Sequence, residues 1–179
     1  SCDENDTLYE RCNLFLRDNV VEFIGPQLRQ AEQVIDASSM VVYPGLINTH
    51  HHLYQLFSRN LPEVQKMELF PWLVTLYDVW KDLDEAVVSR SSLVGMGELL
   101  KNGCTTCFDH HYVFPDRAGD LIAAQFRAAE TVGMRFHASR GSMDLSQKDG
   151  GLPPDSVVQS IDEIMTDSER LVRVWHDPE

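Results

Sequence analysis

Two helical segments separate three short apolar strands after residue 43, and this order constrains the fold more than any other feature. We expect strands at 46–50, 105–109 and 134–139, a helix from Asp84 to Gly103 and a second helix from about 117 to 131. Gly103 and Gly133 each follow a helix and can end it. Strands joined by helical crossovers run parallel with right-handed connections, so the sequence predicts an α/β fold.

The first 43 residues have a different character and are expected to form short strands. Residues 14–16 and 20–24 flank an Asp18-Asn19 turn and predict a hairpin, which Gly25-Pro26 closes. A further extended run, 34–35 and then 40–43, leads into Pro44-Gly45. At the other end, Asp155 is expected to open a last helical region that reaches Trp175. We therefore divide the chain at 1–43 and 44–179.

Charge and apolar patterning exclude several classes of protein. The chain has 15 Lys and Arg against 28 Asp and Glu, so its formal charge is 15 − 28 = −13, which opposes binding to a nucleic-acid polymer. No window approaches the roughly 20 apolar residues of a membrane span, and the first residues lack the basic start of a secretion signal. We expect a cytoplasmic protein with no membrane partner. Cys104 and Cys107 satisfy a CxxC pattern, but strand-forming residues surround them and no partner pair follows, which favours reduced thiols over a zinc or redox site.

His50, His51 and His52 follow the first apolar strand of the α/β part. Alternation along a strand sends residues i and i+2 to the same face, so His50 and His52 can share one metal while His51 points away. Ring nitrogens would then lie about 2.0 to 2.2 Å from a zinc ion. The alternative is a pair of solvated histidines at a polar loop entry. Because active sites of parallel barrels form where strands end, we favour the metal-binding interpretation.

The segment from Pro44 to His52 resembles the first-strand signature of the amidohydrolase superfamily, PG(L/F)(I/V)(N/D)xHxH. Gln55, the run 103–106 and the run 140–143 are similar to the purine and triazine deaminase branch, and residues 140–155 most resemble 8-oxoguanine deaminases and hydroxyatrazine-type aminohydrolases. The resemblance covers nearly every residue from the hairpin to His176-Asp177.

The resemblance implies a distorted (β/α)8 barrel with a small β-sandwich, one divalent metal and hydrolytic removal of an amino group. Zinc is the expected metal and iron is the alternative. The implied reaction is deamination of 8-oxoguanine to urate and ammonia, with guanine or a hydroxyatrazine-type triazine as alternative substrates. A metal that lowers the pKa of bound water would supply the attacking hydroxide. We also expect the full-length enzyme to be a homo-oligomer.

Four residues are candidates for substrate binding, and each has a structural alternative. Gln55 and Arg140 match positions where the resemblance implies contacts to the purine, whereas a loop hydrogen bond and a salt bridge are the alternatives. Trp72, like Tyr77, lies in the insertion after the first strand and could cover a flat substrate or pack in the core. His111 is expected at the mouth of the barrel, although a hydrogen-bonded structural histidine is the more frequent outcome.

The expectation for His111 depends on strand parity. Thr105, Cys107, Asp109 and His111 form one alternating set, which is small and polar and therefore suited to a barrel interior. The other set, Thr106, Phe108 and His110, would then face the helices.

The chain is short for the fold that it resembles. A (β/α)8 barrel takes about 250 residues, but the part after residue 43 has 179 − 43 = 136. We expect the front part of the barrel, its first three β/α units, preceded by strands of the β-sandwich. The remaining metal ligands and the acid–base residues that the resemblance implies have no match here and are expected beyond Glu179, so residues 1–179 alone should be inactive. A noncatalytic binding module is the alternative from another class.

Overall fold

The computed structural model describes residues 4–5 and 7–177, and the chain divides into two compact units, residues 1–45 and 46–179. In the first unit, β1 (Asn13–Arg17) and β2 (Val20–Gly25) pair antiparallel around a turn in which Asp18 has a φ of 54°. The expected hairpin is confirmed. Among the described residues this sheet has two strands.

The expected extended run from 34 to 43 is not a strand in the structure. Its apolar side chains, from Val34 to Tyr43, are between 62% and 81% exposed. A strand is stable only when a neighbour takes up its backbone hydrogen bonds, and no described strand pairs with this segment. The apolar composition therefore predicted a strand, but this segment has no neighbouring strand to pair with among the described residues.

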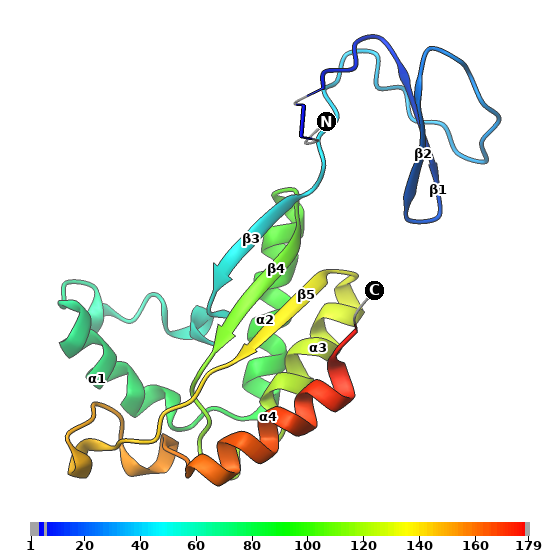
Figure 1. The fold of residues 1–179 in the computed structure, drawn as a ribbon. Coiled ribbons are helices and arrows are strands. Elements are labelled where there is room, and N and C mark those ends of the chain that lie inside the picture. The colour runs from blue at the N-terminus through cyan, green and yellow to red at the C-terminus, as the bar shows by residue number, and fades with distance from the viewer. Residues whose placement is uncertain (1–3, 6, 178–179) are drawn as a thin grey trace. The chain divides into compact units, whose positions relative to one another are not determined.

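The second unit is α/β, as expected. Strands β3 (Leu46–His51), β4 (Cys104–His111) and β5 (Arg135–Arg140) form a parallel sheet in the order β3-β4-β5. Helices α2 (Glu85–Lys101) and α3 (Leu121–Val132) connect them and lie together against one face of the sheet (Figure 1). The expected β-α-β-α-β order and the parallel pairing are confirmed.

Local signals explain where the helices begin and end. The Asp84 carboxylate accepts a hydrogen bond from the backbone N–H of Val87, so it caps α2 as expected. Gly133 follows α3 with a φ of 70°, a left-handed conformation that favours glycine. Helix α3 begins at Leu121 rather than near 117, because the carboxylate of Asp120 caps it.

The remaining helices lie in the insertion after β3 and in the last part of the chain. They are η1 (Leu53–Ser58), η2 (Pro62–Val64), α1 (Leu69–Trp80), η3 (Gln147–Asp149), η4 (Asp155–Val157) and α4 (Ile161–Trp175). Asp155 opens only the short 3₁₀ helix η4, whereas α4 starts later, where Ser160 and Glu163 form a reciprocal capping box. In the described part of the chain, no helix is long and apolar enough to cross a membrane.

Two apolar clusters hold the second unit together. One lies between the sheet and its helices and includes Met96 of α2, Cys107 of β4 and Ala128 of α3. The other surrounds Tyr54 and Trp80, whose rings meet edge to face at 5.3 Å. The second cluster packs the insertion against the loop after β4 and the first turn of α3.

Candidate metal centre

The end of β3 contains a bulge that sets the direction of its histidines. Asn48 pairs with Cys107 and His51 pairs with Asp109, so three residues of β3 advance against two of β4. The Asn48 side-chain oxygen accepts a hydrogen bond from the backbone N–H of His50 at 3.0 Å. Bulges bend a strand and redirect its side chains, and they are common beside active sites.

His50 and His52 converge on one point beyond this bulge. Their Nε2 atoms lie 3.1 Å apart. Two nitrogen ligands of a tetrahedral zinc ion, each about 2.0 to 2.1 Å from the metal, would be separated by about 3.3 Å. The two residues therefore fit the group that the sequence implies.

His51 does not share this point. Its side chain is half-buried, its Nδ1 atom has no hydrogen-bond partner among the described residues, and burial together with the neighbouring His52 lowers its pKa. The alternation of a strand explains why His51 turns away from its two neighbours.

The orientation of His52 is fixed by its other ring nitrogen. Nδ1 lies 2.7 Å from the carbonyl oxygen of His110, so Nδ1–H donates and the lone pair is on Nε2. Burial lowers the pKa of His52, which favours the neutral form that binds a metal. Among residues 4–5 and 7–177, no third His, Cys, Asp or Glu joins the pair in a metal-binding group. The described residues therefore bring two candidate nitrogen ligands together, fewer than the four ligands of a tetrahedral zinc site.

The structure reverses the expected orientation of β4. Cys107 is fully buried against α2 and α3, and Asp109 accepts hydrogen bonds from the Leu53 backbone and from the Gln125 side chain of α3, each at 2.6 Å. Phe108 and His110 instead lie on the opposite face, where their rings contact those of His137 and His50. The small size of Cys107 suits close packing of helices on the sheet, and Gln125 satisfies the carboxylate. The sequence analysis therefore assigned the two alternating sets of β4 residues to the wrong faces of the sheet.

The CxxC pair has the character of packed thiols. Burial and the nearby Asp109 carboxyl raise the pKa of Cys107 to about 12, so the thiolate that redox or zinc chemistry needs is disfavoured. Cys104, also buried, donates to the carbonyl oxygen of Thr106.

His111 is in the core and not at an open strand end, so its expected place is corrected. Its Nε2–H donates to the Val113 carbonyl at 2.8 Å, and the rings of Tyr54 and Phe114 lie within 5.0 Å. Burial lowers the pKa of His111 to about 4, which keeps the ring neutral. The structure thus favours the structural alternative for this residue.

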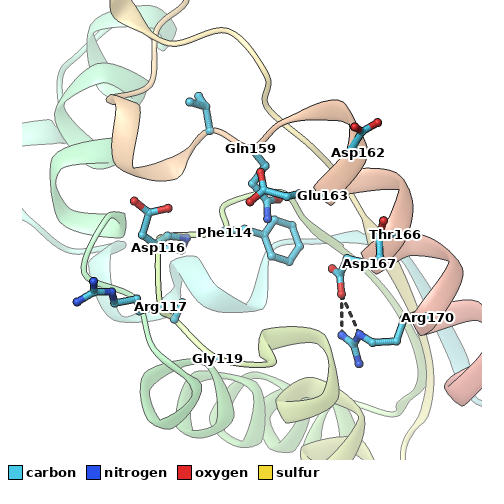
Figure 2. Close-up of a pocket in the computed structure, with 13 residues that line it drawn as sticks. Phe114, Asp116, Arg117, Gly119, Gln159, Asp162, Glu163, Thr166, Asp167 and Arg170 are labelled. Atoms are coloured by element: carbon cyan, nitrogen blue, oxygen red, sulfur yellow. Dashed lines mark hydrogen bonds and ion pairs between the residues drawn. The ribbon is translucent and has the colours of Figure 1, made fainter.

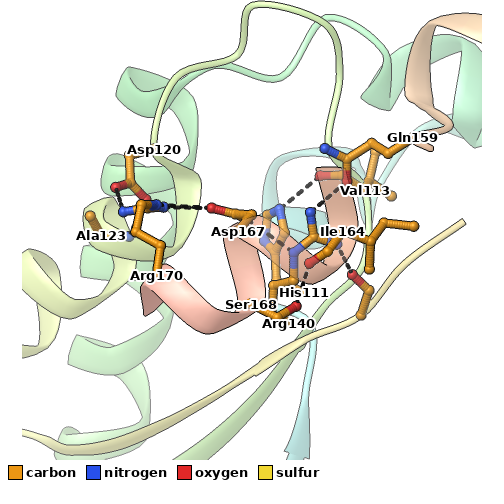
Figure 3. A network of polar contacts seen from close by, with 11 residues as sticks. His111, Val113, Asp120, Ala123, Arg140, Gln159, Ile164, Asp167, Ser168 and Arg170 are labelled. Atoms are coloured by element: carbon orange, nitrogen blue, oxygen red, sulfur yellow. Dashed lines mark hydrogen bonds and ion pairs between the residues drawn. The ribbon is translucent and has the colours of Figure 1, made fainter. Parts of the chain in front are cut away.

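Arg140 joins β5 to α4 through a buried network (Figure 3). Its side chain is 6% exposed, and its three nitrogens donate to Asp167 at 3.0 Å, Gln159 at 2.6 Å and the Gly141 carbonyl at 2.7 Å. The guanidinium also lies 4.1 Å from the centre of the Phe114 ring. These contacts correspond to the salt-bridge alternative for Arg140.

The other candidate residues lie in the insertion after β3. Gln55 is in η1, three residues after His52, and its amide donates to the Tyr54 hydroxyl at 3.2 Å. Trp72 and Tyr77 both meet the Trp80 ring edge to face, at 5.5 and 5.8 Å, and pack with the apolar cluster. Core packing therefore describes Trp72 and Tyr77, whereas Gln55 lies in the turn after His52 and donates its backbone N–H to the His52 carbonyl at 3.0 Å.

Sequence reasoning missed His110, which lies next to both histidines of the pair. Its ring stacks on that of His50 with centroids 4.4 Å apart. The signal that could have found it is Gln125, a polar residue on the buried face of a helix. Such a residue needs a polar partner, and Asp109 on the helix-facing side of β4 would have placed His110 on the open side.

A hollow elsewhere in this unit is separate from the histidine pair. It lies between the loop after β4 and the first turns of α4, has a volume of about 640 Å³ and is lined by Phe114, Gln159 and charged residues (Figure 2). Arg170 in its wall pairs with Asp167 and Asp120, each at 2.7 Å.

Comparison with known proteins places this geometry in a family. The model of the amidohydrolase family matches residues 41–179. The chain belongs to the amidohydrolase family. As a member of that family, it is 46% identical over 160 residues to the 8-oxoguanine deaminase of Pseudomonas aeruginosa, a match that covers 88% of this chain and 36% of the relative. It is 38% identical to the hydroxydechloroatrazine ethylaminohydrolase of a Pseudomonas species, over 96% of this chain and 39% of that relative.

Solved structures agree with the sequence relatives. The zinc complex of atrazine chlorohydrolase from Arthrobacter aurescens superposes with a TM-score of 0.88 and 29% identity, over 99% of this chain and 41% of that one. The chain thus spans between 36% and 41% of these amidohydrolases.

Proposed function

We propose that the chain is the front part of a metal-dependent aminohydrolase that converts 8-oxoguanine and water to urate and ammonia. The observation that carries this proposal is the convergence of His50 and His52 on one point, with Nε2 atoms 3.1 Å apart. The 46% identity to an 8-oxoguanine deaminase supports the choice of substrate.

His50 and His52 would hold the metal, zinc by preference and iron as the alternative. The metal supplies an activated water by lowering its pKa toward neutrality. The chain's own residues prepare this site: the His110 carbonyl holds His52 in the tautomer with a free Nε2, and the bulge at Asn48 directs His50 toward it. Gln55, whose amide donates to the Tyr54 hydroxyl, would hydrogen-bond the ring edge of the purine.

The architecture of the whole protein is part of the proposal. We infer that β3, β4 and β5 begin a (β/α)8 barrel and that β1 and β2 belong to a small β-sandwich. The remaining metal ligands and the acid–base residues would then follow Glu179. The match to only two-fifths of each relative supports this inference. A homo-oligomeric, cytoplasmic enzyme remains our prediction.

A triazine aminohydrolase is the second candidate. The 38% identical relative is an ethylaminohydrolase of hydroxydechloroatrazine, and the chain superposes on an atrazine chlorohydrolase. The purine of the first candidate and the triazine of the second are both flat nitrogen heterocycles that carry an exocyclic substituent on an amidine-like carbon. The same two histidines therefore suit either reaction.

Ammonia or amine release by the full-length enzyme tests the proposal. We expect the highest kcat/KM with 8-oxoguanine among 8-oxoguanine, guanine and hydroxyatrazine. Gln55→Ala should lower this value tenfold to a hundredfold, since about 1.4 to 2.7 kcal/mol of transition-state binding would be lost. Gln30→Ala, at an exposed position of the first unit, is the matched control and should have no effect. A preference for hydroxyatrazine would establish the second candidate, and no release from any substrate would refute both.

A further inference from the structure

We propose that His110 is a positioning residue for both metal-binding histidines, because its ring orients His50 while its backbone carbonyl orients His52. This inference rests on the proposed function, in which the pair holds a metal. It assigns His110 a part that neither its sequence position nor strand alternation indicated.

The ring of His110 contacts two other rings. It stacks on His50, with centroids 4.4 Å apart and planes 23° from parallel. The Phe108 ring lies 4.5 Å from it at 32°, and Nε2 of His110 lies 3.4 Å from the carbonyl oxygen of Thr49. The imidazole of His110 is thereby held in place and presents a fixed flat surface to His50.

His50 needs this support more than His52 does. His52 donates its Nδ1–H to a carbonyl, the arrangement that usually fixes a metal-binding histidine. His50 is exposed, and among the described residues no hydrogen bond to its Nδ1 atom is found. A stacked neighbour restricts rotation of the ring, so that Nε2 of His50 keeps facing Nε2 of His52.

The support for His52 comes from the backbone of the same residue. The carbonyl of His110 lies on β4, which pairs with β5 at His110 and Ser139. The preceding residue, Asp109, holds the backbone N–H of Leu53. Two consecutive residues of β4, Asp109 and His110, therefore accept hydrogen bonds from the two residues that follow β3, Leu53 and His52.

The two parts of this arrangement can be separated by substitution. A change at position 110 removes the imidazole but leaves the carbonyl in place, so it tests the role of the ring separately from that of the backbone. His110→Ala removes the flat surface, whereas His110→Phe keeps a ring without nitrogen atoms. Because Nε2 of His110 also lies 3.4 Å from the Thr49 carbonyl oxygen, this pair of variants separates the contribution of the stacked ring from that of its nitrogen atoms.

The experiment measures zinc affinity of the full-length enzyme by competition with a chromogenic chelator. His110→Ala should bind zinc 10- to 100-fold more weakly, the usual effect of losing an outer support of a metal ligand. His110→Phe should stay within about threefold of the wild type, since the stacked ring remains. His137→Ala is the matched control, because His137 is exposed on the same face but its ring contacts Phe108 and not the pair.

Two results would overturn the inference. Wild-type affinity in His110→Ala would show that the ring does not position His50. Equal weakening in His110→Phe and His110→Ala would show that the nitrogen, and not the stacked ring, matters. His50→Ala tests the proposed function separately: unchanged zinc binding there would refute the metal centre itself. If zinc binding follows the expected pattern but no substrate releases ammonia, the proposed reaction fails and the role of His110 stands.

Discussion

Asp109 is a carboxylate enclosed between β4, α3 and the turn after His52. Burial is the main cause that raises the pKa of Asp109 to about 6, although hydrogen bonds from Leu53 and Gln125 oppose it. The folded protein therefore binds this proton more tightly than the unfolded chain, whose pKa is near 3.8. The stabilisation is complete below pH about 4 and is lost as the pH rises through about 6.

We predict that Asp109→Asn removes this pH dependence. The side-chain oxygen of asparagine can still accept from Leu53, and its amide can donate to Oε1 of Gln125 once the Gln125 amide turns over. That oxygen is buried without a partner in the present arrangement. Urea unfolding at pH 4.5 and 7.5 should show that the variant gains stability relative to the wild type at the higher pH, on the order of 2 to 3 kcal/mol. An equal difference at both pH values would contradict the assignment. His111 contributes a pH dependence of the opposite sign, because its lowered pKa of about 4 favours folding above pH 6.5. This contribution is present in both the wild type and the Asp109→Asn variant, so it cancels in the difference between their free energies of unfolding.

Arg140 permits a second prediction at the scale of single residues. Arg140→Lys should lower the free energy of unfolding by about 2 to 4 kcal/mol, because one ammonium group cannot replace the contacts to Asp167, Gln159 and Gly141. Arg127→Lys is the control, since its ion pair with Glu85 is about half exposed and should contribute less than about 1 kcal/mol. Equal small effects in the two variants, measured by urea unfolding, would show that the Arg140 network is not structural.

Among the secondary-structure elements, α2 determines how closely the turn after His52 can pack. A Cβ atom added at Gly95 would lie 2.6 Å from Cδ2 of the buried Leu53 and would also collide with Leu56, whereas at Gly97 it would meet nothing within 4 Å. Gly95 is thus a close contact between α2 and η1.

The two glycines give a matched pair of variants. Gly97→Ala should stabilise the protein by about 0.5 to 1 kcal/mol, because alanine favours a helix more than glycine does. Gly95→Ala should destabilise it by about 1 to 3 kcal/mol, since the overpacked leucines outweigh the same gain. Thermal unfolding measures both. Stabilisation by Gly95→Ala would mean that η1 moves away from α2 at little cost.

The sequence predicted the elements of the second unit well because their signals are local. Asp84 and Gly133 act through bonds and dihedral angles within one turn, so they are visible without knowledge of the fold. The strand expected at 34–43 failed because pairing needs a distant partner. The start of α4 was missed because Ser160 with Glu163 forms a better cap than Asp155.

For the whole molecule, the family and the histidine pair could be predicted, but strand alternation alone did not give the faces of β4. Its two alternating sets each combine apolar and polar residues, so composition does not decide which set meets the helices. The contacts of Cys107 with α2 and α3 and of Asp109 with Gln125 decide it. Once that choice is known, His110 takes the place beside the pair that the parity argument had assigned to His111.

The central claim is that His50 and His52, and not His51, hold the metal of an aminohydrolase. Zinc content of the full-length enzyme after dialysis, measured by mass spectrometry for single variants of the three residues, tests it most directly. We expect about one zinc per chain in the wild type and in His51→Gln, and loss of the metal in His50→Ala and in His52→Ala, because removing either Nε2 leaves a single ligand on this strand. Full zinc in both His50→Ala and His52→Ala, or its loss only in His51→Gln, would contradict the account.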